Sequence, residues 1–361
     1  MALGLGGTEA GPNWRYRAAS AIALCALVAG CSAFAAKASG EAVRVRRCEY
    51  LAVDGAKLFL LTRGADRRAP VLLWLHGGPG GAERPLFRFF NGGLEERFVV
   101  AYWDQRGAGR SFDPKADPHL LIVARHLADL DAVVDHLRRD FGRDKIILVG
   151  HSWGGALGLL YAQAHPEKVS ALIAVAPLIS LREAEQAQYE FVLAEASRRK
   201  DDDALARLRK IGPPPNKTVG QQIAMEDLAQ RYGGAFHREP HKMWVVLRGI
   251  FAGVVTPWEL PRLFRAIHVS LAAMNDELLG LDVSRSVPSL DVPVVFFLGR
   301  YDRHADAKLA AAYLEALHAP VKRAIWFENS AHNVPFEEPA LFRASVESVL
   351  QSIAISGHGG G

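Results

Sequence analysis

The chain of 361 residues contains only three cysteines, and all of them lie within its first fifty residues. Beyond Cys48 no thiol is present. Since disulfides and thiolate metal sites both require cysteine side chains, neither can form in the part of the chain that follows. We therefore expect that part to be stabilised by packing. No phosphate loop or dinucleotide loop is present either, so the sequence implies no cofactor.

A concentrated run of one sign of charge is also missing. The chain has 43 Lys and Arg residues against 39 Asp and Glu residues, a formal net charge of +4. Its longest basic run, residues 198–200, is followed directly by the aspartates at 201–203. Because binding of nucleic acid requires basic side chains concentrated on one face, we expect no nucleic-acid partner.

The N-terminal region, residues 1–36, has the pattern of an export signal, with two arginines before an apolar run. Residues 28–31 read VAGC and resemble a bacterial lipobox, which predicts lipidation of Cys31 and an exported lipoprotein attached to a membrane. Two alternatives stay open. Cleavage after Ala35 would give a secreted protein, and an uncleaved apolar run would give an N-terminal membrane anchor.

Short, continuous apolar runs follow a β-rich region that turns at Asp54 and Gly55. The runs occupy residues 71–75, 98–103, 146–149, 171–176, 294–298 and 324–327. Strands of this kind are buried on both faces, as in a parallel sheet covered by helices. Amphipathic helical patterns lie between them, beginning at Leu127 and Leu309. The alternation predicts a doubly wound, mostly parallel sheet of the α/β class.

Strand signals vanish between residues 178 and 288, where charged, helix-like stretches dominate. An insertion of this type between two strands predicts a helical cap over the sheet. The core would then consist of residues 43–177 and 289–355. The glycine-rich end, residues 356–361, is expected to be disordered.

The strongest motif is G-x-S-x-G at residues 150–154, which predicts Ser152 as a nucleophile. A strand-like run precedes it and a helix-like run follows it. The glycines two positions before and after the serine leave room for a sharp strand-to-helix turn. That turn lifts the hydroxyl above the sheet, beside a helix N-terminus that favours developing negative charge.

A serine nucleophile needs a base, and the base needs an acid to orient it. In this fold the acid and the base follow the serine in that order, on loops after later strands. Asp302 follows one predicted strand and His332 follows the next, so they are the predicted acid and base. Asp306 and Glu328 remain alternatives for the acid, and His304 for the base.

A glycine-rich turn, HGGPG at residues 76–80, also follows a predicted strand. Attack on a carbonyl creates an oxyanion that needs N–H donors fixed in advance. Glycine amides can point inward because no Cβ blocks the approach. The N–H of Trp153, the residue after the nucleophile, would be the second donor. A plain turn is the alternative interpretation of these glycines.

Four motifs together resemble the proline iminopeptidase group of the α/β-hydrolase fold, and they lie at residues 76–80, 103–111, 150–155 and 299–302. The resemblance implies a triad of Ser152, Asp302 and His332. It also implies an oxyanion hole formed by the amides of Gly78 and Trp153, with Gly77 as a possible donor. The implied activity is that of an aminopeptidase acting on small peptides.

In that group, acidic cap residues bind the free amine of the substrate, and the acidic cap segment of the group has no counterpart here. Candidates for this role are Glu190, Glu226, Asp276 and Glu277. A carboxylesterase or lipase-like hydrolase of acyl esters, with the same triad, is the main alternative. A non-catalytic lipoprotein that binds a ligand is a third, although such a protein usually lacks a triad residue. Nothing in the sequence indicates an oligomeric state.

Overall fold

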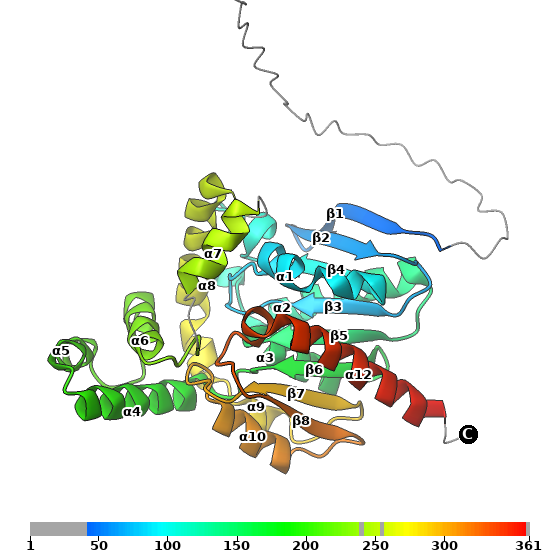
Figure 1. Ribbon diagram of the computed structural model, residues 1–361. Helices are drawn as coiled ribbons and strands as arrows, with labels where there is room; N and C mark the ends of the chain where they lie inside the picture. The colour runs from blue at the N-terminus through cyan, green and yellow to red at the C-terminus, as the bar shows by residue number, and fades with distance from the viewer. Residues whose placement is uncertain (1–41, 238–241, 253–255, 359–361) are drawn as a thin grey trace, which may run out of the picture. The chain divides into compact units, whose positions relative to one another are not determined.

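The computed structural model describes residues 42–237, 242–252 and 256–358, and one eight-stranded sheet organises them (Figure 1). The strand order is β1-β2-β4-β3-β5-β6-β7-β8. Strand β2 pairs antiparallel with β1 and with β4, and every other pairing is parallel. The predicted mostly parallel sheet of the α/β class is confirmed. The strands are β1 (Val45–Val53), β2 (Ala56–Gly64), β3 (Val71–Leu75), β4 (Val99–Asp104), β5 (Ile146–His151), β6 (Val169–Val175), β7 (Val294–Gly299) and β8 (Lys322–Phe327).

The turn between β1 and β2 consists of the two residues that the sequence singled out. Asp54 has φ 42° and Gly55 has φ 76°, so both adopt the left-handed conformation. A two-residue hairpin turn of type I′ requires this conformation at both positions, and Asp-Gly supplies it at low cost.

The apolar runs locate the parallel strands to within two residues at each end. Strand β3 coincides with its run at 71–75, whereas β8 begins two residues before its run, at the exposed Lys322. The difference arises because sheet pairing is made by the backbone, which continues past the last fully buried side chain.

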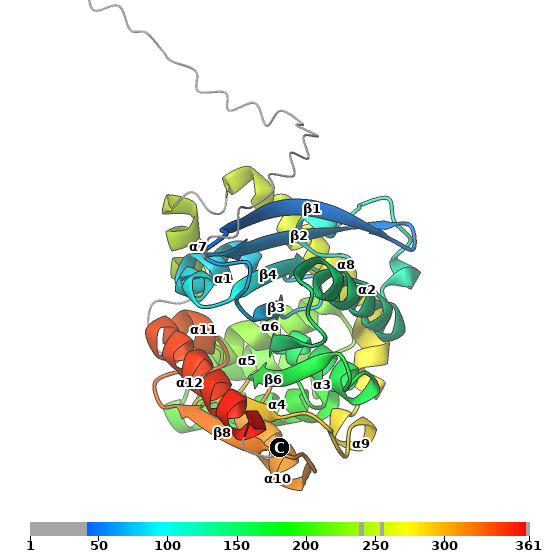
Figure 2. The same cartoon turned by 90° about the vertical axis from the view of Figure 1, so that its right-hand side faces the viewer.

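Helices cover both faces of the sheet (Figure 2). One face carries α1 (Arg84–Asn91), α11 (Val334–Glu337) and α12 (Pro339–His358). The other carries α2 (Val123–Phe141), α3 (Trp153–Ala164), α9 (Val283–Ser286) and α10 (Ala307–Ala316). Short 3₁₀ turns lie at η1 (Gly92–Glu96), η2 (Gly109–Ser111), η3 (Pro118–Leu120) and η4 (Pro257–Glu259).

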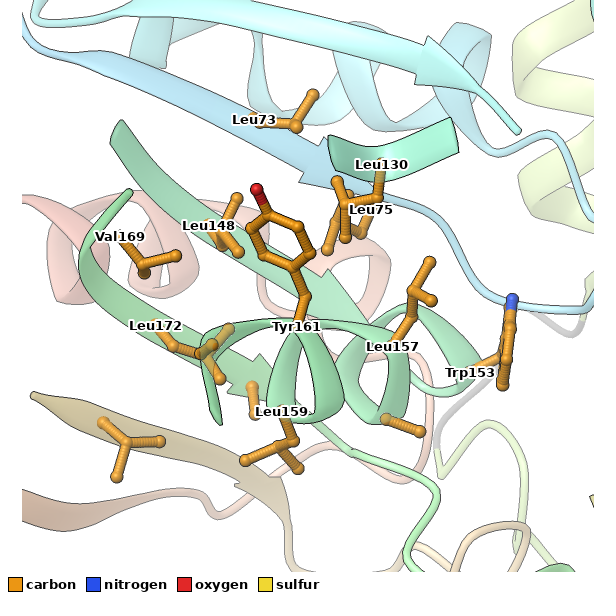
Figure 3. Close-up of a cluster of buried hydrophobic side chains, with 14 of the residues drawn as sticks. Leu73, Leu75, Leu130, Leu148, Trp153, Leu157, Leu159, Tyr161, Val169 and Leu172 are labelled. Atoms are coloured by element: carbon orange, nitrogen blue, oxygen red, sulfur yellow. The ribbon is translucent and has the colours of Figure 1, made fainter. Parts of the chain in front are cut away.

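Helix α3 is the most deeply buried of these helices and begins at the residue after Ser152. Its side chains Leu157 and Tyr161 pack among leucines of β3 and β5, together with Leu172 of β6 (Figure 3). A fully buried leucine or aromatic side chain contributes about 1.5–3 kcal/mol to stability. The packing therefore fixes the helix whose N-terminus holds the serine.

The segment between β6 and β7 contains the helices that the sequence assigned to a cap at 178–288. They are α4 (Leu181–Arg199), α5 (Asp202–Ile211), α6 (Val219–Arg231), α7 (Lys242–Phe251) and α8 (Leu260–Gly280), followed by α9. Figure 1 shows α4, α5 and α6 grouped apart from the helices that cover the sheet. They have a small core of their own, made by Val192, Ala196, Ala204, Leu208, Met225, Leu228 and Ala229.

The described residues begin at 42 and end at 358, so they include most of the C-terminal segment but none of the export segment. Helix α12 is assigned as far as His358, so it extends into the segment 356–361 for which the sequence predicts disorder. Residues 359–361 lie outside the described residues. The export segment at 1–36, with Cys31, lies outside the described residues. No helix in the described ranges is both long enough and apolar enough to cross a membrane.

Candidate active site

Ser152 occupies a strained turn between β5 and α3. Its φ is 54° and its ψ is −118°, a combination that costs a non-glycine residue on the order of 1–3 kcal/mol. The flanking glycines make the turn possible. A Cβ at Gly150 would lie 2.2 Å from the carbonyl oxygen of Gly154, and a Cβ at Gly154 would lie 2.1 Å from that of Leu75. The main chain of this turn therefore holds the serine in one position.

Asp302 and His332 form a buried pair. The Nδ1 atom of His332 lies 2.9 Å from Oδ2 of Asp302, and both side chains are buried. The other oxygen, Oδ1, accepts the backbone N–H groups of His304 at 2.8 Å and Ala305 at 3.1 Å. Burial alone would raise the pKa of Asp302, but the neighbouring histidine and these hydrogen bonds outweigh it and lower the pKa. The carboxylate therefore stays ionised and orients the imidazole.

The alternative acids are engaged elsewhere. Asp306 caps α10 by accepting backbone N–H groups of its first turn. Glu328 forms an exposed ion pair with Arg300 at 2.6 Å. The ring of the alternative base, His304, lies 4.5 Å from the ring of His332. Of the predicted acids, the structure brings Asp302 to the histidine.

A partly buried glutamate that the sequence did not reveal, Glu337, holds the loop of His332. Oε1 of Glu337 accepts the N–H groups of Ala331 at 2.9 Å and Asn333 at 3.1 Å, on either side of the histidine. Its Oε2 accepts the N–H of His237, in the segment before α7, at 2.7 Å. Burial raises the pKa of Glu337 to about 7. This one carboxyl group thus links the histidine loop to the cap.

Ser152 and His332 line the same cavity, which has a volume of about 330 Å³. Three glutamates also line it: Glu83 from the core, and Glu185 and Glu226 from the cap. None of the described residues that line it is a lysine or an arginine. Leucine, isoleucine and phenylalanine side chains from both core and cap also line it, together with the amides Gln188, Asn216, Gln222, Asn275 and Asn333. The cavity therefore combines apolar and amide groups with three carboxyl groups.

The predicted oxyanion-hole residues lie at this cavity. Gly77 and Gly78 line it, and Gly78 has a φ of +118°, at which a Cβ would lie 2.6 Å from the nitrogen of Gly81. The amide of Gly77 is hydrogen-bonded to Glu83, which lowers the pKa of that glutamate. Trp153 is the first residue of α3, and its N–H has no acceptor within the helix. Gly78 and Trp153 are thus better suited than Gly77 to receive an oxyanion.

A network of buried hydrogen bonds supports the glycine-rich turn at 76–80. Nδ1 of His76 lies 2.7 Å from the carbonyl oxygen of Gly77, and its Nε2 lies 3.0 Å from the backbone nitrogen of Gln105. The side chain of Gln105 donates to the carbonyl of His76 at 2.8 Å and accepts the indole N–H of Trp153 at 3.0 Å. Burial lowers the pKa of His76, so it is neutral with its proton on Nδ1. The segment at 103–111 thus connects the glycine-rich turn with Trp153, the two sides of the predicted oxyanion hole.

A second acid–histidine pair, Glu83 and His151, was not predicted from the sequence. Nδ1 of His151 lies 2.7 Å from Oε1 of Glu83, and its Nε2 lies 3.0 Å from the carbonyl oxygen of His332. Burial lowers the pKa of His151, but the charge and hydrogen bond of Glu83, together with the hydrogen bond to the carbonyl of His332, outweigh it and raise the pKa. Both ring nitrogens face acceptors, as a protonated imidazole requires. The signal in the sequence was a histidine directly before the nucleophile.

The four cap carboxylates proposed from the sequence have different environments. Glu226 lines the cavity. Glu190 is exposed and accepts a hydrogen bond from Gln186, and Asp276 is also exposed. Glu277 accepts the N–H of Val123 at 2.9 Å, at the start of α2. The structure thus keeps Glu190, Asp276 and Glu277 away from the cavity, because their helices turn other faces toward it.

Comparisons with known proteins agree with this architecture. Residues 70–339 match the alpha/beta hydrolase fold family. The protein named "Probable aminopeptidase YbaC" from Bacillus subtilis (strain 168) is 32% identical over 294 residues, which cover 81% of this chain and 92% of that protein. A proline iminopeptidase from Saccharolobus solfataricus is 26% identical over 303 residues, covering 81% and 87%. The crystal structure of a Mycobacterium smegmatis proline iminopeptidase superposes with a TM-score of 0.63 at 19% identity, covering 86% of this chain and 100% of that one.

Proposed function

Since this chain belongs to the α/β-hydrolase fold family and resembles its proline iminopeptidases, we propose that it is a serine aminopeptidase acting on short peptides. The observation that carries the proposal is the charge of the cavity that contains Ser152. Three glutamates line it, no lysine or arginine is among its described lining residues, and a protonated His151 balances the charge of one glutamate at most. A protonated amine gains from such surroundings, whereas an anionic substrate would be repelled.

In the proposed reaction, the hydroxyl of Ser152 attacks the scissile carbonyl while Nε2 of His332 takes its proton. Asp302 holds the imidazole in the required tautomer and stabilises the imidazolium. The amides of Gly78 and Trp153 donate to the oxyanion of the tetrahedral intermediate. The imidazolium then protonates the departing amine, which leaves an acyl-enzyme. Water, deprotonated by the same histidine, hydrolyses the acyl-enzyme and regenerates the serine.

A second candidate function is hydrolysis of acyl esters by the same triad. The leucine, isoleucine and phenylalanine side chains that line the cavity favour it, because they could accommodate an acyl chain. The two functions differ in one requirement. Only the aminopeptidase needs a free amine next to the scissile carbonyl.

An assay with matched arylamides tests the proposed function. We expect L-alanine p-nitroanilide to be hydrolysed with a kcat/KM at least about 30-fold above that of propionyl p-nitroanilide, which lacks only the amine, since a buried charge-assisted contact is lost. Equal rates on the two arylamides, together with rapid hydrolysis of p-nitrophenyl butyrate, would instead identify an esterase.

We further propose that the protein is exported and attached to a membrane through Cys31, on the basis of VAGC at the end of the apolar run. Two or more acyl chains on one cysteine are sufficient for stable attachment. The Cys31→Ser variant should therefore be released from membranes or remain unprocessed, and should no longer incorporate labelled palmitate. A wild-type N-terminus at Ala36 or at Met1, measured by intact mass, would rule this proposal out.

A further inference from the structure

Glu83 brings a core carboxylate close to the nucleophile. A Cβ at Gly77 would lie 3.0 Å from Oε1 of Glu83 and 3.3 Å from the Cβ of Ser152. These two distances place the glutamate oxygen within about 6.3 Å of the serine Cβ. Glu83 also lines the cavity, and it comes directly before α1.

One oxygen of this carboxylate has no donor. Oε1 is hydrogen-bonded to His151, whereas Oε2 is buried and has no hydrogen-bond partner among the described residues. Burial alone would raise the pKa of Glu83, but the charge and hydrogen bond of His151 lower it. The group is therefore an ionised carboxylate with an unused acceptor, and a buried acceptor without a donor is destabilising. A ligand that donates to it would remove that cost.

The position matches that of the α-amine of an aminopeptidase substrate. The amine is separated from the carbon that the serine attacks by a single Cα. With covalent bonds of about 1.5 Å and a charge-assisted hydrogen bond of about 2.8 Å, its carboxylate partner lies on the order of 6 Å from the serine Cβ. The upper bound of about 6.3 Å between Oε1 of Glu83 and the Cβ of Ser152 is compatible with this requirement.

The surroundings keep Glu83 in this position. Phe87, one turn further along α1, is fully buried and stacks on Trp74 of β3 with ring centroids 3.6 Å apart. Arg84 is bound to the buried Asp104 at 2.9 Å. The site is thus formed on rigid core elements, as selective binding of a small group requires.

The other buried carboxylate of the cavity is already used. Oε2 of Glu185 accepts the backbone N–H of Asn216 at 2.8 Å, and its Oε1 lies 3.5 Å from the side-chain nitrogen of Gln222. These contacts connect α4 with the start of α6, so Glu185 holds the cap together.

We propose that Glu83 binds the protonated α-amine of the substrate, with His151 as the positioning residue that orients its carboxylate. This inference rests on the proposed aminopeptidase function and assigns its specificity to the core instead of the cap. Without the amine, Glu83 keeps its pairing with His151 and adds nothing to the stabilisation of the oxyanion. The same residue thus selects substrates with an amine and leaves the rate on those without one little changed.

The Glu83→Gln variant tests the assignment, because it removes the charge and keeps the shape. We expect its kcat/KM for L-alanine p-nitroanilide to fall at least about 30-fold, as for loss of one partner of a buried charge pair. Hydrolysis of p-nitrophenyl propionate, which has the same acyl skeleton without the amine, should stay within about threefold of wild type. Glu83→Asp retains the charge but places it one methylene further from the cavity. Its kcat/KM for L-alanine p-nitroanilide should lie between those of wild type and Glu83→Gln.

Glu190→Gln is the matched control, since it makes the same chemical change on the exposed side of α4. Labelling of Ser152 by a fluorophosphonate, which carries no amine, reports that each variant is folded. A parallel loss on both substrates would overturn the inference, because it indicates a general structural role. It would also be overturned if wild type preferred the alanine substrate and Glu83→Gln retained that preference, or if Glu226→Gln abolished it. A wild type that does not prefer the amine would refute the proposed function itself, and with it this inference.

Discussion

The Ser152→Ala variant is expected to lose about 10⁶-fold in kcat on any substrate that the wild type cleaves, as in other triad enzymes that lose the nucleophile. Ser152 carries the only hydroxyl or thiol group among the described side chains that line the cavity. No neighbouring group can therefore replace it. The hydroxyl makes no packing contact that folding requires, so the unfolding free energy should change by less than about 1 kcal/mol.

The control for this variant is Ser197→Ala, which makes the same change at an exposed position of α4. Its kcat should equal that of wild type. Single-turnover and steady-state assays on both variants, with urea unfolding of each, separate loss of chemistry from loss of fold. Residual activity within tenfold of wild type in Ser152→Ala would show that the nucleophile lies elsewhere.

The Asp302→Asn variant should lower kcat by about 10⁴-fold, the loss seen when a triad aspartate becomes an amide. Oδ2 of Asp302 accepts from Nδ1 of His332, which leaves Nε2 free to take the proton of the serine. An amide can place an N–H against Nδ1, and that favours the tautomer in which Nε2 already carries a proton. His332 then already carries a proton on Nε2 and cannot accept the proton of Ser152.

Asp306→Asn provides the comparison, because Asp306 caps α10 and lies only four residues away. Asparagine is about as good a helix N-cap as aspartate, so both stability and kcat should stay close to wild type. Measured pre-steady-state acylation rates decide between the two acids. A larger loss in Asp306→Asn than in Asp302→Asn would mean that the acid has been misassigned.

The features that could be predicted from the sequence are those that local patterns determine. The parallel strands appear as continuous apolar runs because they are buried on both faces. The turn at Ser152 is recognisable because only glycine fits at 150 and 154, where any Cβ would meet a carbonyl oxygen. Asp302 and His332 were located by chain order, which this fold imposes on loops at the same edge of the sheet.

The features that the sequence did not reveal depend on contacts between distant segments. Glu83 and His151 are 68 positions apart, and neither belongs to a motif that requires the other. Glu337 accepts backbone N–H groups of the loop that carries His332. Contacts to the backbone leave no pattern of side chains in the sequence. In the cap, Glu185 and Glu190 lie five residues apart on α4, hence on different faces of a helix with 3.6 residues per turn. Hydrophobic periodicity there was too weak to show which face meets the cavity.

The central claim is that Ser152, activated by His332 and Asp302, is the nucleophile that forms the acyl-enzyme. Mapping the site of covalent modification tests this claim most directly. The protein would be treated with a fluorophosphonate, and the adduct located by intact-mass analysis and peptide sequencing in wild type and in Ser152→Ala. The account predicts one adduct per chain, on the peptide that contains Ser152, and none in the variant. An adduct on another residue, or an unmodified protein that still hydrolyses its substrate, would contradict it.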